Sequence, residues 1–123
     1  AGDNFLPGEG ANIIGNNNTY DFWQVGNDNM SYGRTTGDDN FITSYQFGDS
    51  NMSDVLQTGN GNTANTDQGG LLSGSFLSSV GSTSSVIQNG DFNTSNVLQT
   101  GLNQMSTVSQ IGNSNTSNVT QQN

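Results

Sequence analysis

The stretch Gln46–Leu56, Gln-Phe-Gly-Asp-Ser-Asn-Met-Ser-Asp-Val-Leu, contains a pattern that recurs along the chain. Its pattern returns at Gln88–Leu98 as Gln-Asn-Gly-Asp-Phe-Asn-Thr-Ser-Asn-Val-Leu, and at Gln110–Thr120 as Gln-Ile-Gly-Asn-Ser-Asn-Thr-Ser-Asn-Val-Thr. The shared unit is Gln-x-Gly-x-x-Asn-x-Ser-x-Val-x, eleven residues long. Similarity at a fixed period indicates a repeat architecture in which each copy packs on its neighbours.

The register extends over most of the chain. The units begin at Ile13, Gln24, Thr35, Gln46, Gln57, Gln68, Ser79, Gln88, Gln99 and Gln110, and Gln121 opens a truncated unit. Successive starts are 11 residues apart, except that Ser79 and Gln88 are 9 apart. We interpret the short unit as one that has lost two residues in its arc. A glycine follows two positions after each start: Gly15, Gly26, Gly37, Gly48, Gly59, Gly70, Gly81, Gly90, Gly101 and Gly112.

Each unit combines a turn signal with a short strand. Glycine adopts positive φ without steric cost and asparagine tolerates left-handed backbone, so Gly-x-x-Asn predicts an arc. The rest of the unit predicts a strand whose side chains alternate between two faces. Acidic and variable residues share one face, so the regular face is predicted to point inward. Its amides are Gln24, Gln46, Gln57, Gln68, Gln88, Gln99, Gln110, Asn18, Asn29, Asn40, Asn51, Asn62, Asn93 and Asn115.

The sequence therefore predicts an all-β fold, a flat two-sheet β-solenoid of five 22-residue turns, each made of strand, arc and strand. The expected turns are 13–34, 35–56, 57–78, 79–98 and 99–120, and residues 1–12 are expected to form an extended N-terminal tail. Like residues would stack on like, as in functional amyloid. One ladder is expected to hold Gln24, Gln46, Gln68, Gln88 and Gln110, while Gln57 and Gln99 belong to the opposite sheet.

Composition excludes several classes of function. The chain has 123 residues, 28% of them hydrophobic, and a net charge of −9 with Arg34 as its one base. This charge disfavours nucleic acid and anionic membranes as partners. Without Cys or His, the chain has no disulfide, no thiol nucleophile and no Cys/His zinc site, so we expect no cofactor. No apolar run reaches transmembrane length, and the start Ala1-Gly2-Asp3 is typical of a chain whose signal peptide has been removed.

At Gln57–Gln68 the sequence resembles the curlin repeat family, the subunits of bacterial curli fibres. The family motif is Ser-x5-Gln-x-Gly-x-Gly-Asn-x-Ala-x3-Gln, and Gln57-Thr-Gly-Asn-Gly-Asn-Thr-Ala-Asn-Thr-Asp-Gln68 matches its second part residue for residue. Other units use Ser in place of Ala and often lack the second Gly, and the leading Ser is not systematic. The resemblance covers residues 13–123. It implies a secreted subunit that polymerises into extracellular biofilm fibres at the bacterial cell surface, used in adhesion and cell aggregation.

The resemblance also implies the partners, namely further copies of the chain, a nucleator subunit and a dedicated outer-membrane secretion apparatus. The family's nucleator shares the strict eleven-residue spacing but carries a basic C-terminal repeat. Residues 110–123 here contain no charged side chain, which favours the major subunit over the alternative of a nucleator or minor subunit.

The open ends of a solenoid predict how copies would meet. Each end is a row of unpaired N–H and C=O groups, which soluble solenoids cover with atypical caps. The last full unit, Gln110–Thr120, is among the most regular, so we expect subunits to stack end to end into a polymer. The expected polymer ends are Ile13, Phe22, Val108, Gln110, Val119 and Gln121.

Three other functions fit the sequence less well. Catalysis would need a base or nucleophile beside the one adjacent acidic pair, Asp38-Asp39, and none accompanies it, so we expect no enzyme. A calcium-binding repeat needs a Gly-Gly-x-Gly-x-Asp type unit in every turn. A non-polymerising surface-binding solenoid, of the ice-binding or adhesin type, needs a regular outward array, whereas one outward offset reads Met30, Phe41, Met52, Thr63 and Gly74.

Overall fold

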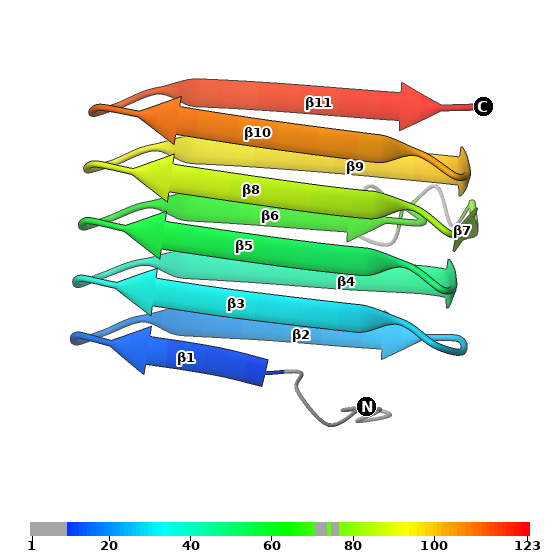
Figure 1. Ribbon diagram of the computed structural model, residues 1–123, viewed down its shortest axis with the longest axis horizontal. Helices are drawn as coiled ribbons and strands as arrows, with labels where there is room; N and C mark the ends of the chain where they lie inside the picture. Colours follow the sequence, from blue (N-terminus) through cyan, green and yellow to red (C-terminus); the bar gives the residue numbers. More distant parts are fainter. Residues whose placement is uncertain (1–9, 71–73, 75–76) are drawn as a thin grey trace.

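The chain forms a coil of parallel β-strands with no helix among the residues described (Figure 1). The computed structural model describes residues 10–70, 74 and 77–123. Its strands are β1 (Gly10–Ile14), β2 (Thr19–Val25), β3 (Met30–Thr36), β4 (Phe41–Asp49), β5 (Met52–Thr58), β6 (Thr63–Gln68), β7 (Ser79–Val80), β8 (Thr83–Asn89), β9 (Thr94–Leu102), β10 (Met105–Ile111) and β11 (Thr116–Gln122).

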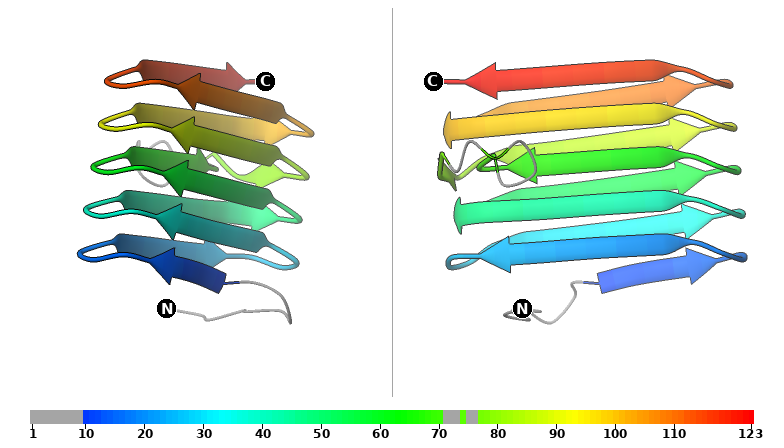
Figure 2. Two further views of the ribbon diagram at one scale, coloured as in Figure 1. Left: turned by 60° about the vertical axis from the view of Figure 1, so that its left-hand side comes forward. Right: turned by 180° about the vertical axis from the view of Figure 1, so that it is seen from behind.

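Two sheets face each other across the coil. Sheet A has the order β1-β3-β5-β8-β10 and sheet B the order β2-β4-β6-β9-β11, and the two-residue β7 pairs with β4 and β9 beside them. Every ladder is parallel, because each strand pairs with the strand one turn away (Figure 2). This arrangement confirms the all-β, two-sheet solenoid and its five turns.

The stacking register corrects the prediction of a shortened arc. Neighbouring turns are offset by 22 residues, as in Met30 against Met52, but Met52 lies against Thr83 and Thr63 against Thr94, an offset of 31. The chain has therefore gained nine residues rather than lost two. β6 ends at Gln68, Gly69 and Gly70 follow with positive φ, and the next described strand begins at Ser79, which pairs with Gly48. The strand expected near residues 73–78 falls largely outside the described residues.

The nine-residue insertion between β6 and β8 exchanges the two sheets for the rest of the chain. One strand fewer lies between β6 and β9 than the eleven-residue period predicts, so every later unit changes side. Gln68 stacks on Gln99 rather than on Gln88, and Gln88 stacks on Gln57. The expected ladder of Gln24, Gln46, Gln68, Gln88 and Gln110 was thus wrong in its last two members, and so was the pairing of Gln57 with Gln99. The expected turns 57–78 and 79–98 do not match the strands for the same reason.

The N-terminal boundary also differs from the prediction. Gly10–Asn12 belong to β1, which pairs with β3 from Gly10 against Tyr32 to Ile14 against Thr36, so the coil begins earlier than residue 13. The remainder of the expected tail, residues 1–9, lies outside the described residues. The extra strand completes the first turn and keeps the number of turns at five despite the strand that is missing later.

The interior of the coil is narrow and largely polar. Burial alternates along each strand, so that Asn, Ser, Val and Gln are enclosed while their neighbours face outward. The apolar part of the core consists of Ile42, Val55, Ala64, Val86, Val97 and Val108, with Tyr20, Phe22 and Val119 packed against it. Because so little apolar area is enclosed, the hydrogen bonds between amide side chains must largely determine which residues stack on each other in neighbouring turns.

Candidate self-assembly surfaces

The inward glutamines form two amide ladders that run along the coil. In sheet B, Gln24 donates to Gln46 at 2.7 Å and Gln46 donates to Gln68 at 2.9 Å. The ladder continues from Gln68 through Gln99 to Gln121, at 3.0 and 2.8 Å. In every step Nε2 belongs to the residue nearer the N-terminus and Oε1 to the residue nearer the C-terminus. The ladder is therefore polar, with donors directed toward the C-terminal end of the coil.

The second ladder, in sheet A, is shorter. Gln57 donates to Gln88 and Gln88 donates to Gln110, both at 2.8 Å. Below Gln57 the same column holds Thr35 and Ile13, which have no amide, so Oε1 of Gln57 is buried without a hydrogen-bond partner. Every ladder glutamine except Gln24 also donates through Nε2 to a backbone carbonyl across the interior, as when Gln88 donates to the carbonyl of Thr63 at 3.0 Å. The glutamines thus tie turn to turn and sheet to sheet.

Replacing Gln88 with leucine should destabilise the fold by about 2–4 kcal/mol, because each buried group left without a partner costs about 1–3 kcal/mol. The change removes the acceptor of Gln57 and the donor of Gln110, and Gln88 itself is fully buried. Chemical denaturation of the soluble chain measures the effect. Gln110→Leu is the matched control, because it interrupts only one ladder step and lies at the end of the coil. Equal losses for the two variants would contradict a ladder that stabilises the coil step by step.

The asparagines close the arcs and hold them one above another. Oδ1 of Asn40 accepts the backbone N–H of Asn62 at 3.0 Å, while Nδ2 of Asn40 donates to the carbonyl of Gly59 at 2.8 Å. The same bonds recur along the column of Asn18, Asn40, Asn62, Asn93 and Asn115. On the other side of the coil the column is Asn29, Asn51, Ser82 and Gln104, which are linked in the same way by backbone N–H donors. These side chains therefore hold neighbouring turns together by hydrogen bonds to the backbone of the adjacent turn.

The left-handed backbone lies one residue before these asparagines. Positive φ of 52 to 59° occurs at Asn17, Asp28, Asp39, Ser50, Phe92, Asn103 and Ser114. Gly61 stands at the equivalent place in its arc, with φ of 64°. The second glycine of the family motif, here Gly61, therefore occupies this left-handed position. In the other units a residue with a side chain adopts the same backbone conformation, at some cost in energy.

The arc glycines allow the turns to approach closely. A Cβ on Gly59 would collide with the carbonyl oxygen of Gly90, and Gly15, Gly26, Gly37 and Gly90 meet the next turn in the same way. Gly48 has Ser79 above it, and Gly101 approaches Asn123. Two predicted arc glycines lie elsewhere: Gly70 follows β6, before the next described strand, and Gly81 stacks over Ser50 rather than Gly48. The eleven-residue phase of Gly70 and Gly81 is thus unrelated to their structural roles.

The N-terminal end of the coil presents apolar groups and acceptors. Ile13 on β1 is 48% exposed, and Phe22 on β2 makes an edge-to-face contact with Tyr20 at 5.7 Å between ring centroids. A Cβ on Gly33 would collide with both rings, so this glycine makes room for them. Burial raises the pKa of Tyr20 above its usual value. The sequence could have revealed this cluster, because Gly33 stands where Val55 stands one turn later.

The C-terminal end is hollow by contrast. Between β10 and β11 lies an open cavity of about 470 Å³, lined by residues that include Val108, Gln110, Ser117 and Val119. Gln121 on β11 accepts from Gln99 and donates to the carbonyl of Met105 at 2.9 Å. The six residues predicted as polymer ends thus divide between two surfaces, Ile13 and Phe22 at one end and Val108, Gln110, Val119 and Gln121 at the other.

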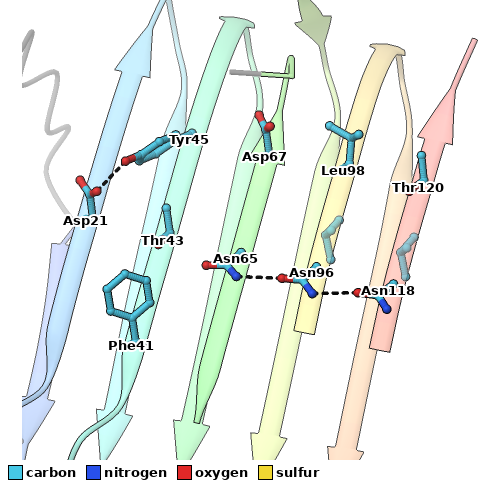
Figure 3. A pocket seen from close by; sticks show the side chains of 12 residues that line it. Asp21, Phe41, Thr43, Tyr45, Asn65, Asp67, Asn96, Leu98, Asn118 and Thr120 are labelled. Atoms are coloured by element: carbon cyan, nitrogen blue, oxygen red, sulfur yellow. Dashed lines mark hydrogen bonds between the residues drawn. The ribbon is translucent and has the colours of Figure 1, made fainter. Parts of the chain in front are cut away.

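A groove of about 550 Å³ crosses the outer face of sheet B (Figure 3). Its lining includes Asp21, Tyr45, Asn65, Asn96 and Asn118. The Tyr45 hydroxyl donates to the Asp21 carboxylate, and this bond raises the pKa of Tyr45. The described residues hold no group of three or more Asp or Glu side chains placed to bind a metal ion, and no helix long and apolar enough to cross a membrane.

Comparison with known proteins bears on the middle of the coil. Residues 37–70, from the arc before β4 to two residues beyond β6, match the family model described as Curlin associated repeat. The resemblance to curlin repeats is thereby confirmed over this segment. No curated protein and no solved structure matches the chain.

Proposed function

Because residues 37–70 match the Curlin associated repeat, we propose that the chain is a structural subunit that stacks end to end into an extracellular cross-β fibre. In this proposal the fibre is part of a biofilm matrix at the bacterial cell surface and serves adhesion and cell aggregation. The partners are further copies of the chain, with a nucleator subunit and an outer-membrane secretion apparatus. The chain has the role of the major subunit rather than of the nucleator, and it performs no catalysis.

The complementary hydrogen-bonding groups at the two ends carry the proposal. At the C-terminal end Gln121 has no amide above it in the described coil, so its ladder ends on a donor. At the N-terminal end no described residue places an amide below Gln24, so the same ladder begins on an acceptor. The asparagine column behaves likewise, because among the described residues no donor reaches Oδ1 of Asn115 at one end and no acceptor reaches the backbone N–H of Asn18 at the other. Placing one end on the other joins donor to acceptor throughout.

The columns also continue in register across such a joint. If the next subunit follows as one more turn, Gln121 stacks under Gln24 and Gln110 stacks under Ile13. Both ends then contribute parallel edges, so β11 pairs with β2 and β10 with β1. The contact is between two different surfaces and does not close on itself, which produces a fibre rather than a ring.

The shapes of the two ends fit the same joint. Tyr20 and Phe22 share columns with Ser117 and Val119, so the aromatic pair of one subunit would lie over the hollow of the other. Ser117 is small, which leaves space for the ring of Tyr20. Filling the hollow with two rings also removes exposed apolar surface from water, at roughly 25 cal/mol per Å² buried.

The charges on the arcs are compatible with stacking. One arc column reads Asn16, Asp38, Asn60, Asp91 and Asn113, so each carboxylate lies between two amides. Each backbone N–H in this column donates to the side-chain oxygen one turn later, as Asp91 does to Asn113 at 2.9 Å. At the joint Asn113 meets Asn16, so no two carboxylates become neighbours there.

Assembly should accelerate with salt, because every subunit carries a net charge of −9 and approaches others of the same sign. Raising sodium chloride from about 10 to 150 mM shortens the screening length from about 30 to 8 Å and should raise the elongation rate roughly tenfold. Seeded growth followed by light scattering measures this rate. Choline chloride should act equally if screening is the cause, and a rate that falls with salt would contradict the explanation.

Incubation of the purified chain tests the proposed function itself. We expect fibres whose diffraction shows a meridional spacing of about 4.8 Å, and growth without a lag when sonicated fibres are added as seeds. A Pro substitution at Thr120 should prevent growth, because the backbone N–H of Thr120 points away from β9 toward the open edge, and proline removes this donor. Persistence of monomers at all concentrations, with or without seeds, would overturn the proposal.

A further inference from the structure

One outward column on sheet B resembles the inward ladders in its polarity. It contains Asp21 on β2, Thr43 on β4, Asn65 on β6, Asn96 on β9 and Asn118 on β11 (Figure 3). Asn65 donates through Nδ2 to Asn96, and Asn96 donates to Asn118, both at 2.8 Å. The Nδ2 group of Asn118 is thus directed toward the open edge of β11, with no described residue of the same chain to accept from it.

The other end of this column is a carboxylate. Oδ2 of Asp21 accepts the hydroxyl of Tyr45, and among the described residues no donor reaches Oδ1. Asp21 is exposed, so water is the remaining partner of its carboxylate in the single subunit. A column that begins with an acceptor and ends with a donor can continue into another copy of itself.

We propose that Asn118 of one subunit donates a hydrogen bond to the Asp21 carboxylate of the next, and that this pair fixes the polarity and register of the joint. The inference rests on the end-to-end stacking proposed above and names the residues that make it specific. Continuation of the coil brings these two residues into the same column, at the strand spacing that already joins Asn96 to Asn118. Hydrogen bonds to an ionised acceptor are about twice as strong as neutral ones.

Other ways of joining two subunits lose this bond. A slip of two residues along the edge places Asn118 against Thr19 or Trp23, neither of which has a carboxylate. A head-to-head joint pairs β2 with β2, so that Asp21 meets no amide donor and its charge lies close to a second Asp21. Like charges across a strand pair are destabilising. The outer column therefore selects one stacking mode among those that main-chain pairing alone would permit.

The two residues cannot interact within one subunit. They lie on the outermost strands of sheet B, with β4, β6 and β9 between them. Any energetic coupling between substitutions at positions 21 and 118 must therefore arise between subunits.

The test compares critical concentrations for fibre growth in wild type, Asn118→Asp, Asp21→Asn and the double variant. Asn118→Asp places two carboxylates together at every joint and should raise the critical concentration about tenfold. Within the subunit the new carboxylate still accepts from Asn96, so circular dichroism of the monomer should not change. In the double variant the new amide at position 21 can donate to the new carboxylate at position 118, and the critical concentration should return close to the wild-type value.

Thr107→Asp is the matched control. It adds the same charge to the outer face of the other C-terminal strand, where the stacked position in the next subunit is Gly10. We expect it to change the critical concentration much less than Asn118→Asp does. Fibres in which Asp21→Asn fails to rescue Asn118→Asp, or in which Thr107→Asp acts as strongly as Asn118→Asp, would overturn the assigned pair while leaving fibre formation intact. A wild-type chain that forms no fibres would overturn the pair together with the proposed function.

Discussion

Replacing Val119 with aspartate should abolish fibre elongation while leaving the monomer folded. Val119 lines the hollow at the C-terminal end and is only partly buried in the single subunit, where a carboxylate can remain hydrated. In the fibre it would lie under Phe22 of the next subunit, enclosed by apolar groups. Burying an unpaired carboxylate costs several kcal/mol. We expect this cost to exceed the free energy that favours association of two subunits at one joint. Seeded growth and sedimentation of fibres measure the effect.

The control for this prediction is Ile87→Asp. It makes the same kind of change, from a branched apolar side chain to a carboxylate, on β8 in the middle of the coil and on its outer face. Ile87 is 40% exposed, so neither the fold nor the joint should suffer from a hydrated charge there. Normal elongation of Val119→Asp would show that the hollow is not the contact surface. Loss of elongation in both variants would show that the added negative charge, and not its position in the hollow, prevents growth.

Replacing Gly59 with alanine should destabilise the monomer by at least about 3 kcal/mol or prevent folding. The residue has φ of 116°, a conformation that costs a side-chain-bearing residue about 1–3 kcal/mol. The new Cβ would in addition collide with the carbonyl oxygen of Gly90, which belongs to the backbone and cannot rotate away. The two turns would have to separate, and the hydrogen bonds of the adjacent arc would weaken with them. Denaturation followed by circular dichroism measures the loss.

Gly112→Ala separates the two causes. Gly112 has a similar φ of 102°, but its Cβ would meet only Nδ2 of Asn115, at 3.6 Å, because it lies in the last arc of the coil. The monomer should therefore lose only the conformational part of the free energy. In a fibre the same Cβ would face the arc of Gly15 in the next subunit, so elongation should fail although the monomer folds. A monomer as unstable as that of Gly59→Ala would show that φ, rather than the close approach, makes these glycines necessary.

The eleven-residue period and the alternation of side chains along each strand were sufficient to predict a two-sheet β-solenoid. Gly at a fixed phase marks the arcs, and strand alternation then places Gln57 and Val55 on the same inward face. The structure buries both completely. These inferences succeed because they depend on local chemistry, namely the φ angles that glycine permits and the alternation of side chains in any strand. Neither requires knowledge of which strand lies beside which.

The pairing of strands could not be predicted past residue 68. Gly70 and Gly81 keep the eleven-residue phase, so the nine-residue insertion resembles one more unit followed by a short one. Only the three-dimensional register, with Met52 against Thr83, shows that a strand is missing from the stack. Such an error leaves the burial of every glutamine unchanged but assigns Gln88 and Gln99 to the wrong sheets. The arcs also differ from the prediction in one detail. The left-handed backbone is adopted by Asp39 and its equivalents, one residue before the asparagine, and not by the asparagine itself.

The residues at the two ends of the coil could be located in part from the sequence, and their role in assembly stays a prediction. The repeat pattern places Phe22 on the first strand of its sheet and Val119 on the last, so both could be located at the ends. The position of the Tyr20 ring depends on the space that Gly33 leaves by having no side chain, and the repeat pattern alone does not show this contact. The acceptor at Gln24 and the donor at Gln121 acquire their meaning only from the common direction of all the amide bonds in the ladder.

Cryo-electron microscopy of fibres grown from the purified chain would show how neighbouring subunits meet. We expect each subunit to rise by about 24 Å along the fibre, which is five strand layers at about 4.8 Å each. We also expect β11 of every subunit to pair in parallel with β2 of the next, with Gln121 under Gln24. A map in which neighbouring subunits are related by a two-fold axis, with β2 against β2, would overturn end-to-end stacking.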